Sequence, residues 1–129
     1  IDPRCPYCHQ AYASLIPYMD KGVTIKWIPT VALGRSEQGL PLANAVLHAK
    51  TRAELDKIMA DPPAYPRALS GNDQETLQRN LTFMFQAFEQ NGGQAGVPVA
   101  FFIDQKSGQP RMMMGISEEV VIQTILGKL

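Results

Sequence analysis

The sequence has few of the residues that metal centres and charged interfaces use. It contains two cysteines and two histidines in 129 residues, and its 12 basic residues are balanced by 12 acidic ones. Without a second C-x-x-C, a closed four-ligand zinc site lacks its ligands. The balanced charge provides no basic stripe for nucleic acid, and the longest apolar run, Val97 to Ile103, is far too short to cross a bilayer. We therefore expect neither nucleic-acid binding nor membrane insertion.

The composition indicates one folded domain over residues 1–129. Hydrophobic residues make up 45% of the chain and charged residues 19%, which is enough apolar material for a core at this length. Internal repeats and low-complexity segments are absent.

Both cysteines lie in one motif, Cys5-Pro6-Tyr7-Cys8. A helical pattern of apolar residues follows directly, so Cys5 is expected to cap a helix with Pro6 at its first position. Unpaired N–H groups and the positive end of the helix dipole favour a thiolate there. Cys5 is thus the candidate nucleophile, and Cys8, one turn later, is the candidate resolving thiol.

Three other interpretations of the motif remain open. A structural disulfide is one, although so short a loop gives little stabilisation. Residues 5–9 also fit the C-x-x-C-H pattern of c-type haem attachment, with Met84 or the Met112–Met114 run as an axial ligand. The third is a zinc half-site completed by His9 or His48.

The rest of the chain has an α/β pattern with a helical middle. A strand should precede the C-x-x-C helix, as in βαβ redox units, and almost all of that strand would lie before residue 1, so we expect a truncated or processed domain. The predicted elements are a helix over 6–20 with Pro17 inside and Gly22 after it, a strand over 23–28, helices over 41–49, 51–60 and 73–90, strands over 97–104 and 109–114, and a last helix capped by Ser117.

With these features in place, the chain resembles the catalytic domain of the bacterial periplasmic thiol-disulfide interchange proteins, of the DsbG and DsbC type. The likeness covers nearly the whole chain and is weakest between Arg35 and Ser70. Pro6-Tyr7 between the cysteines resembles DsbG, and His9 after them resembles DsbC. The residues that carry the resemblance are Asp2 to His9, Pro17, Gly96-Val97-Pro98-Val99 and Gly115.

The resemblance implies a thioredoxin-like fold with a helical insertion over roughly residues 35–92 and a first strand largely missing from the chain. Pro98 would be a cis-proline facing the C-x-x-C. The backbone of Val97, with Tyr7, would hold an extended client segment, and Pro6 and His9 would tune the thiol. No cofactor is implied.

The implied activity is disulfide isomerisation or reduction of client proteins in the periplasm, with a membrane redox partner that resets the dithiol. The N-terminal dimerisation region of the isomerases is absent, so this fragment is expected to be a monomer, whereas a longer form with that region would be a homodimer.

Two related activities stay open beside isomerisation. Val97 stands where the isomerases usually carry threonine, as in DsbA-like oxidases, which leaves a dithiol oxidase as an alternative. A sulfenic-acid reductase would use the same two thiols on oxidised client cysteines. The haem electron carrier remains the alternative from another class.

Overall fold

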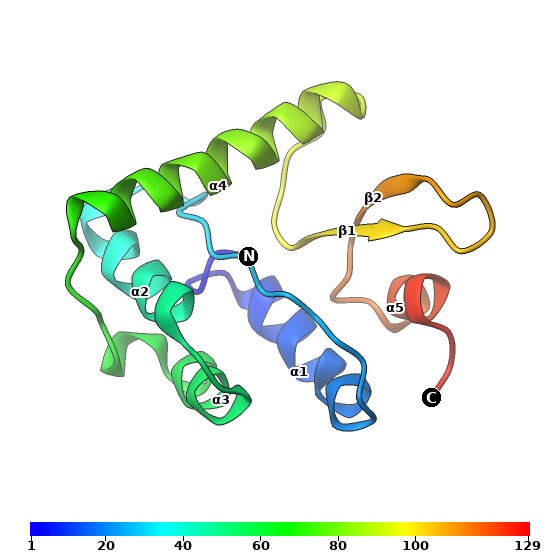
Figure 1. Cartoon of the computed structure of the whole chain (residues 1–129), viewed down its shortest axis with the longest axis horizontal. Coiled ribbons are helices and arrows are strands. Elements are labelled where there is room, and N and C mark those ends of the chain that lie inside the picture. The colour runs from blue at the N-terminus through cyan, green and yellow to red at the C-terminus, as the bar shows by residue number, and fades with distance from the viewer.

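The computed structural model describes all residues from Ile1 to Leu129 and has a mixed α/β architecture. The structure has five α-helices and one two-stranded antiparallel hairpin, which lies at one side of the molecule (Figure 1). The elements are α1 (Pro6–Asp20), α2 (Ser36–His48), α3 (Arg52–Ala60), a short 3-10 helix η1 (Pro62–Ala64), α4 (Gly71–Gln90), β1 (Val99–Ile103), β2 (Pro110–Met114) and α5 (Glu119–Leu126).

Helix α1 begins and ends where the sequence predicts. Cys5 is the N-cap residue, with extended backbone (φ −82°, ψ 124°), and Pro6 takes the first helical position. Gly22 follows the last turn with φ 96°, a left-handed conformation that glycine adopts without a steric cost. The helix therefore presents its N-terminus at the motif that carries both cysteines.

Helix α2 starts five residues before the predicted Pro41, so the predicted start is wrong. The chain enters the helix at Arg35, which has φ 48° and whose carbonyl accepts the N–H groups of Gln38 and Gly39. Pro41 lies inside the helix rather than at its first position. The helix therefore starts at the turn of Arg35, upstream of the proline, and it lacks one backbone hydrogen bond at Pro41 because proline has no N–H.

The caps of the next two helices depend on short polar side chains. Thr51 accepts the N–H of Glu54 and starts α3 as predicted. Ser70 and Asp73 form a capping box, so α4 begins at Gly71, two residues before the predicted start. Both helices belong to the expected helical middle of the chain.

The predicted hairpin is confirmed, although β1 starts two residues later and ends one residue earlier than predicted, and β2 starts one residue later. Val99 pairs with Met114 and Ile103 with Pro110 in an antiparallel register. The predicted cap of α5 is wrong, because Glu118 rather than Ser117 is the N-cap residue. The N–H of Glu118 bonds the carbonyl of Gly115, which closes a turn that buries Ser117.

The strand predicted over residues 23–28 is extended but unpaired, and the prediction of a strand is wrong for this reason. Its side chains alternate as a strand's would: Val23, Ile25 and Trp27 are half-buried, whereas the residues between them are exposed. No strand lies beside it to make a hydrogen-bonded ladder. Only at its far end do Ile28 and Thr30 bond the backbone of Ile1.

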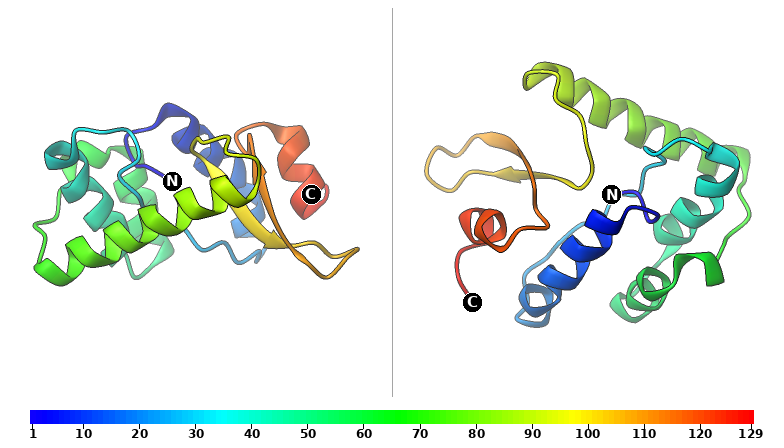
Figure 2. Two further views of the ribbon diagram at one scale, coloured as in Figure 1. Left: turned by 90° about the horizontal axis from the view of Figure 1, so that it is seen from above. Right: turned by 180° about the vertical axis from the view of Figure 1, so that it is seen from behind.

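Helix α1 lies in the middle of the molecule, with α2 and α3 on one side and α5 on the other (Figures 1 and 2). One buried cluster joins α1 to α2 and α3, and a separate cluster joins it to α5. The buried members are Ile1, Cys5, Cys8, Tyr12, Ala45, Val46, Ile58 and Met59 in the first cluster and Leu15, Tyr18 and Ile122 in the second. None of the helices combines the length and apolar character needed to span a bilayer.

Candidate active site

The two cysteines lie at the N-terminus of α1 at different depths. Both are free thiols in the structure. Cys5 is 5% exposed and caps the helix, whereas Cys8 is 0% exposed and lies within the first turn. Burial raises the pKa of Cys8 to about 12, despite a hydrogen bond from the backbone of Asp2. Cys8 therefore stays protonated and out of reach of solvent, and Cys5 is the outer of the two sulfurs.

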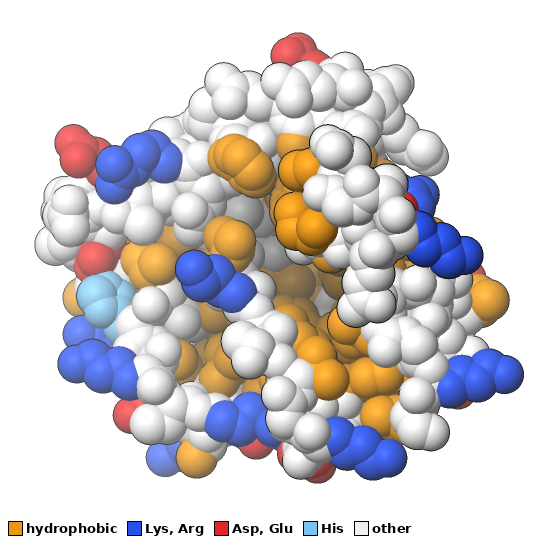
Figure 3. Space-filling model, turned by 45° about the vertical axis from the view of Figure 1, so that its right-hand side comes forward, with side chains coloured by type: hydrophobic (Ala, Val, Ile, Leu, Met, Phe, Trp, Pro, Cys, Tyr) orange, Lys and Arg blue, Asp and Glu red, His pale blue; other side chains and the backbone are white.

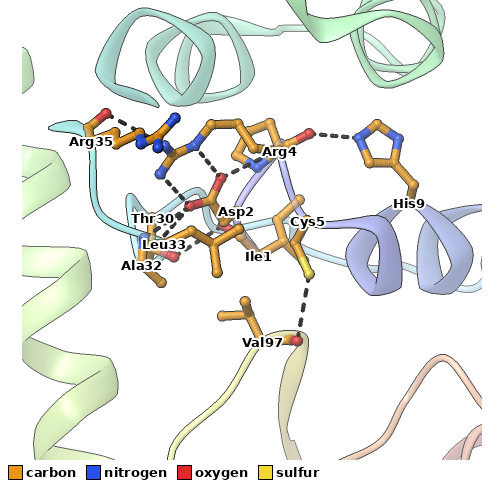
Figure 4. A network of polar contacts seen from close by, with 11 residues as sticks. Ile1, Asp2, Arg4, Cys5, His9, Thr30, Ala32, Leu33, Arg35 and Val97 are labelled. Carbon is orange, nitrogen blue, oxygen red and sulfur yellow. Dashed lines mark hydrogen bonds and ion pairs between the residues drawn. The ribbon is translucent and has the colours of Figure 1, made fainter. Parts of the chain in front are cut away.

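The loop before β1 faces Cys5. The Cys5 thiol donates a long hydrogen bond to the carbonyl of Val97, with 3.8 Å between sulfur and oxygen (Figure 4). The Val97–Pro98 peptide bond is cis, as the resemblance implies, and Pro98 is buried. The fold thus brings together the two segments, 92 residues apart, that the sequence singled out.

The remaining predicted residues differ in how they lie at the site. Tyr7 is 63% exposed and Pro6 is exposed beside it, so both project from the helix start toward solvent. His9 Nε2 lies 2.6 Å from the carbonyl oxygen of Pro3, and its ring is turned away from the Cys5 sulfur (Figure 4). Tyr7 is placed to meet a partner molecule, whereas the contact of His9 is with the backbone before the motif.

Comparison with protein-family models, curated proteins and solved structures found no match.

A buried carboxylate fixes the backbone that leads into the motif. Asp2 is 1% exposed, and its Oδ1 accepts the backbone N–H and the Nε–H of Arg4. Its Oδ2 accepts Arg4 Nη2 and the backbone N–H groups of Ala32 and Leu33, at 2.9, 3.0 and 3.2 Å (Figure 4). Asp2 therefore ties the segment before Cys5 both to itself and to the loop before α2.

The hydrogen bonds and charge of Arg4 lower the pKa of Asp2 by more than burial raises it. Burial alone would raise the pKa of this carboxyl, but the bonds and charge of Arg4 and the N–H of Leu33 bring the pKa below its ordinary value. In the sequence, Asp2 and Arg4 belong to the residues that carry the resemblance, which assigns them no role of their own. The signal was available as an acid and a base two residues apart, directly before the C-x-x-C.

The guanidinium of Arg4 needs the space left by Gly39 on α2. A Cβ at residue 39 would lie 2.7 Å from Arg4 Cζ and 2.8 Å from Val31 Cγ1, both closer than real contacts allow. A glycine within α2 costs helix stability relative to alanine, by about 1 kcal/mol. Close packing against the Asp2–Arg4 pair is the feature that offsets this cost.

Replacing Gly39 with alanine is therefore expected to destabilise the protein, against the usual preference of helices for alanine. Overpacking costs about 1–3 kcal/mol, which exceeds the gain in propensity. Urea unfolding of Gly39→Ala and of Gly71→Ala measures the effect, because a Cβ at Gly71 meets nothing within 4 Å. Equal or higher stability for Gly39→Ala than for Gly71→Ala would contradict the role given to this contact.

The two histidines weighed for metal binding contact different parts of the chain. His48 Nε2 contacts Asp73 Oδ1 at 2.8 Å between α2 and α4, whereas His9 faces Pro3. No group of three or more His, Cys, Asp or Glu side chains comes together in the molecule. Met84 is buried in α4, and the Met112–Met114 run lies in β2. The donors for a zinc half-site do not meet at the two thiols.

Proposed function

We propose that this protein is a thiol-disulfide oxidoreductase of the thioredoxin-like type, which reduces or isomerises disulfides of client proteins. The observation that carries the proposal is the pair of thiols at the start of α1, with Cys5 capping the helix and facing Val97 and with Cys8 enclosed behind it. Cys5 lies at the positive end of the α1 dipole, and burial keeps Cys8 as a thiol until it is needed.

The order of the chain around α1 supports a thioredoxin-like arrangement. The N–H of Ile1 bonds the carbonyl of Ile28, and the N–H of Thr30 bonds the carbonyl of Ile1. In a parallel strand pair, a residue of one strand donates its N–H to one residue of the other strand and accepts an N–H from the residue two positions further on. Ile1 does this with Ile28 and Thr30. This one parallel pairing supports a βαβ relation between the segments on either side of α1, with the redox motif between them.

The proposed reaction moves two electrons from the enzyme to the client. The Cys5 thiolate attacks one sulfur of a client disulfide, which forms a Cys5–client mixed disulfide and releases the other client sulfur as a thiolate. Cys8 then loses its proton and attacks Cys5, which forms the Cys5–Cys8 disulfide and releases the second client thiol. In isomerisation, a free client thiolate attacks the mixed disulfide instead and regenerates Cys5.

Exposed side chains at the helix start are suited to client binding. Tyr7 is exposed beside the C-x-x-C motif, and the Val97 carbonyl faces the Cys5 sulfur. An extended client segment can pair with backbone groups while its side chains contact the aromatic ring. In this proposal Tyr7, Val97 and Pro98 hold the client, and the two cysteines perform the exchange.

The proposal is tested with a protein of scrambled disulfides and with the same protein fully reduced. The dithiol form of the chain should restore native disulfides in the scrambled protein, and the disulfide form should oxidise the reduced protein slowly. A higher rate in the second assay would assign the oxidase activity instead, and no activity in either would refute thiol exchange.

The difference in burial predicts selective alkylation of the two thiols. Because burial raises the pKa of Cys8 to about 12, its thiolate is rare at pH 8. Iodoacetamide should therefore modify Cys5 first, and mass spectrometry after proteolysis should find label on Cys8 only at much higher pH. Labelling of Cys8 at a rate equal to that of Cys5 would contradict the assignment of the outer and inner thiol.

A further inference from the structure

Three of the six methionines follow one another in strand β2. The side chains of the Met112–Met114 run are all half-buried, whereas Met59 and Met84 are 3% and 4% exposed. Met19 is also half-buried, and its sulfur accepts the indole N–H of Trp27. A dissolved oxidant has to reach a thioether before it can convert it to a sulfoxide. The run in β2 is therefore the main group of methionines open to this reaction.

Strand β2 is the outer strand of the hairpin. Figure 3 shows a hollow lined with hydrophobic side chains on one face of the molecule, and residues 99–102 of β1 belong to its lining. None of the three methionines of β2 lines this hollow. Strand β2 pairs with β1 along one edge, and no further strand lies beyond it. The methionine run therefore lies at the free edge of the hairpin.

The register of the hairpin distinguishes Met114 from the methionine before it. Met114 pairs with Val99, and Met113 pairs with Ala100. Directly paired residues share a face of the hairpin, and successive residues of a strand alternate between the two faces. Met113 and Met114 are therefore on opposite faces. Because Val99 directly follows Pro98, Met114 lies at the end of the hairpin that joins the loop facing the thiols.

The side chain of Met114 packs on the backbone of that loop. A Cβ added to Gly96 would lie 2.8 Å from Met114 Cε, so the methyl group occupies the space that any side chain at residue 96 would need. The sulfur of Met114 is one bond away from this methyl group. Gly96 directly precedes Val97, whose carbonyl oxygen lies 3.8 Å from the Cys5 sulfur. One side-chain contact therefore connects the thioether to the segment that covers the outer thiol.

We propose that Met114 is an oxidation site, and that conversion of its thioether to the sulfoxide by a peroxide displaces the segment of Gly96 and Val97 from Cys5. In this reaction a lone pair of the sulfur attacks one oxygen of hydrogen peroxide. An S–O bond forms as the O–O bond breaks, the sulfur loses two electrons, and the second oxygen leaves as water. The effect on client exchange rests on the proposed function, whereas the displacement of the segment does not.

The sulfoxide does not suit the contact that the thioether makes. Its new oxygen is a strong hydrogen-bond acceptor, and burying it without a donor costs free energy. Gly96 has no side chain that can move aside, so the backbone has to give way. Cys5 is only 5% exposed, and a shift of Val97 would open its sulfur to solvent and remove the carbonyl proposed to hold a client. Alkylation of Cys5 should therefore become faster while client exchange becomes slower.

The first test uses a chain without thiols, Cys5→Ser with Cys8→Ala, treated with hydrogen peroxide. Tandem mass spectrometry locates the added oxygen, and NMR follows the backbone amide of Val97. This amide should shift when Met114 is oxidised, and it should still shift in a Met113→Leu chain but not in a Met114→Leu chain. Leucine is close to methionine in volume, so each replacement removes one sulfur with little change in packing. An unshifted amide at full oxidation of Met114, equal shifts in both leucine chains, or oxidation of Met113 without Met114 would overturn the proposal.

The second test measures activity in the wild type. The Cys5–Cys8 disulfide form is treated with hydrogen peroxide, which spares the thiols, and dithiothreitol then reduces the disulfide. Client exchange should fall about tenfold, and iodoacetamide should label Cys5 at least about twofold faster while Cys8 stays unlabelled. Methionine sulfoxide reductases should reverse both changes.

The leucine variants again provide the controls. Met114→Leu should keep the rates of its own untreated form, whereas Met113→Leu should lose activity as the wild type does. Unchanged rates in the fully oxidised wild type, equal losses in both variants, or labelling of Cys8 would overturn the proposal. An untreated wild type without exchange activity would refute the proposed function instead, and the amide of Val97 in the thiol-free chain would still decide the role of Met114.

Discussion

Replacing Cys5 with serine is expected to reduce disulfide exchange to the level of buffer alone, whereas replacing Cys8 is expected to trap client proteins on Cys5. The reason is the order of the two steps: Cys5 forms the mixed disulfide and Cys8 releases it. Nonreducing electrophoresis of each variant with a disulfide-containing client distinguishes the two outcomes. Covalent complexes should accumulate with the Cys8 variant and disappear on addition of a reductant.

The choice of replacement controls for loss of folding. Serine is a good N-cap residue, so Cys5→Ser should retain α1. Cys8 has no exposed surface, and a hydroxyl there would need a hydrogen-bond partner, so Cys8→Ala is the matched variant without a new polar group. Cys8→Ser and Cys8→Ala should both trap clients. Equal loss of activity in all three variants, with no covalent complex, would refute the roles assigned to the two sulfurs.

Replacing Asp2 with alanine is expected to cost about 3–5 kcal/mol of stability, the range for removing one partner of a buried ion pair. The loss leaves the Arg4 guanidinium without its carboxylate and the N–H groups of Ala32 and Leu33 without an acceptor. Urea unfolding of the wild type and of Asp2→Ala measures this loss of stability. Asp61→Ala is the matched control, because Asp61 is exposed and its side chain makes no hydrogen bond, so a change within about 0.5 kcal/mol is expected.

The same variant should change how stability depends on pH. The pKa of Asp2 is below its ordinary value in the folded protein, so its contribution is present above the unfolded pKa of about 3.9 and is lost as the pH falls through the folded pKa. The stability difference between wild type and Asp2→Ala should therefore be constant at neutral pH and shrink in acid. A difference that stays constant from pH 6 to pH 2 would exclude an ionised Asp2 as its source.

Local chemistry made the first part of the fold predictable from the sequence. The C-x-x-C, the proline at the first helical position and the apolar spacing after it predict α1 from Pro6 to Asp20, as found. The turn residues between β1 and β2 likewise predict the hairpin. In each case a few neighbouring residues determine the structure, so no information about distant contacts was needed.

Distant contacts explain what the sequence did not predict. Helix α2 starts at Ser36 because Arg35 and the space around Arg4 set its first turn, and Arg4 lies 31 residues from Arg35 in the chain. The burial of Asp2 depends on its acceptance of two N–H groups from residues 32 and 33. In segment 23–28 half-buried and exposed side chains alternate as in a strand. A hydrogen-bonded ladder also needs a neighbouring strand, and the local sequence does not show whether one is present.

The 92-residue separation between Cys5 and Val97 affects how the site forms during synthesis. The thiols are synthesised 92 residues before the carbonyl that faces Cys5. At 5–20 residues per second, roughly 5 to 18 s pass between the two events. During that interval the nascent thiols lack their enclosing loop and are open to whatever oxidant or electrophile surrounds the growing chain.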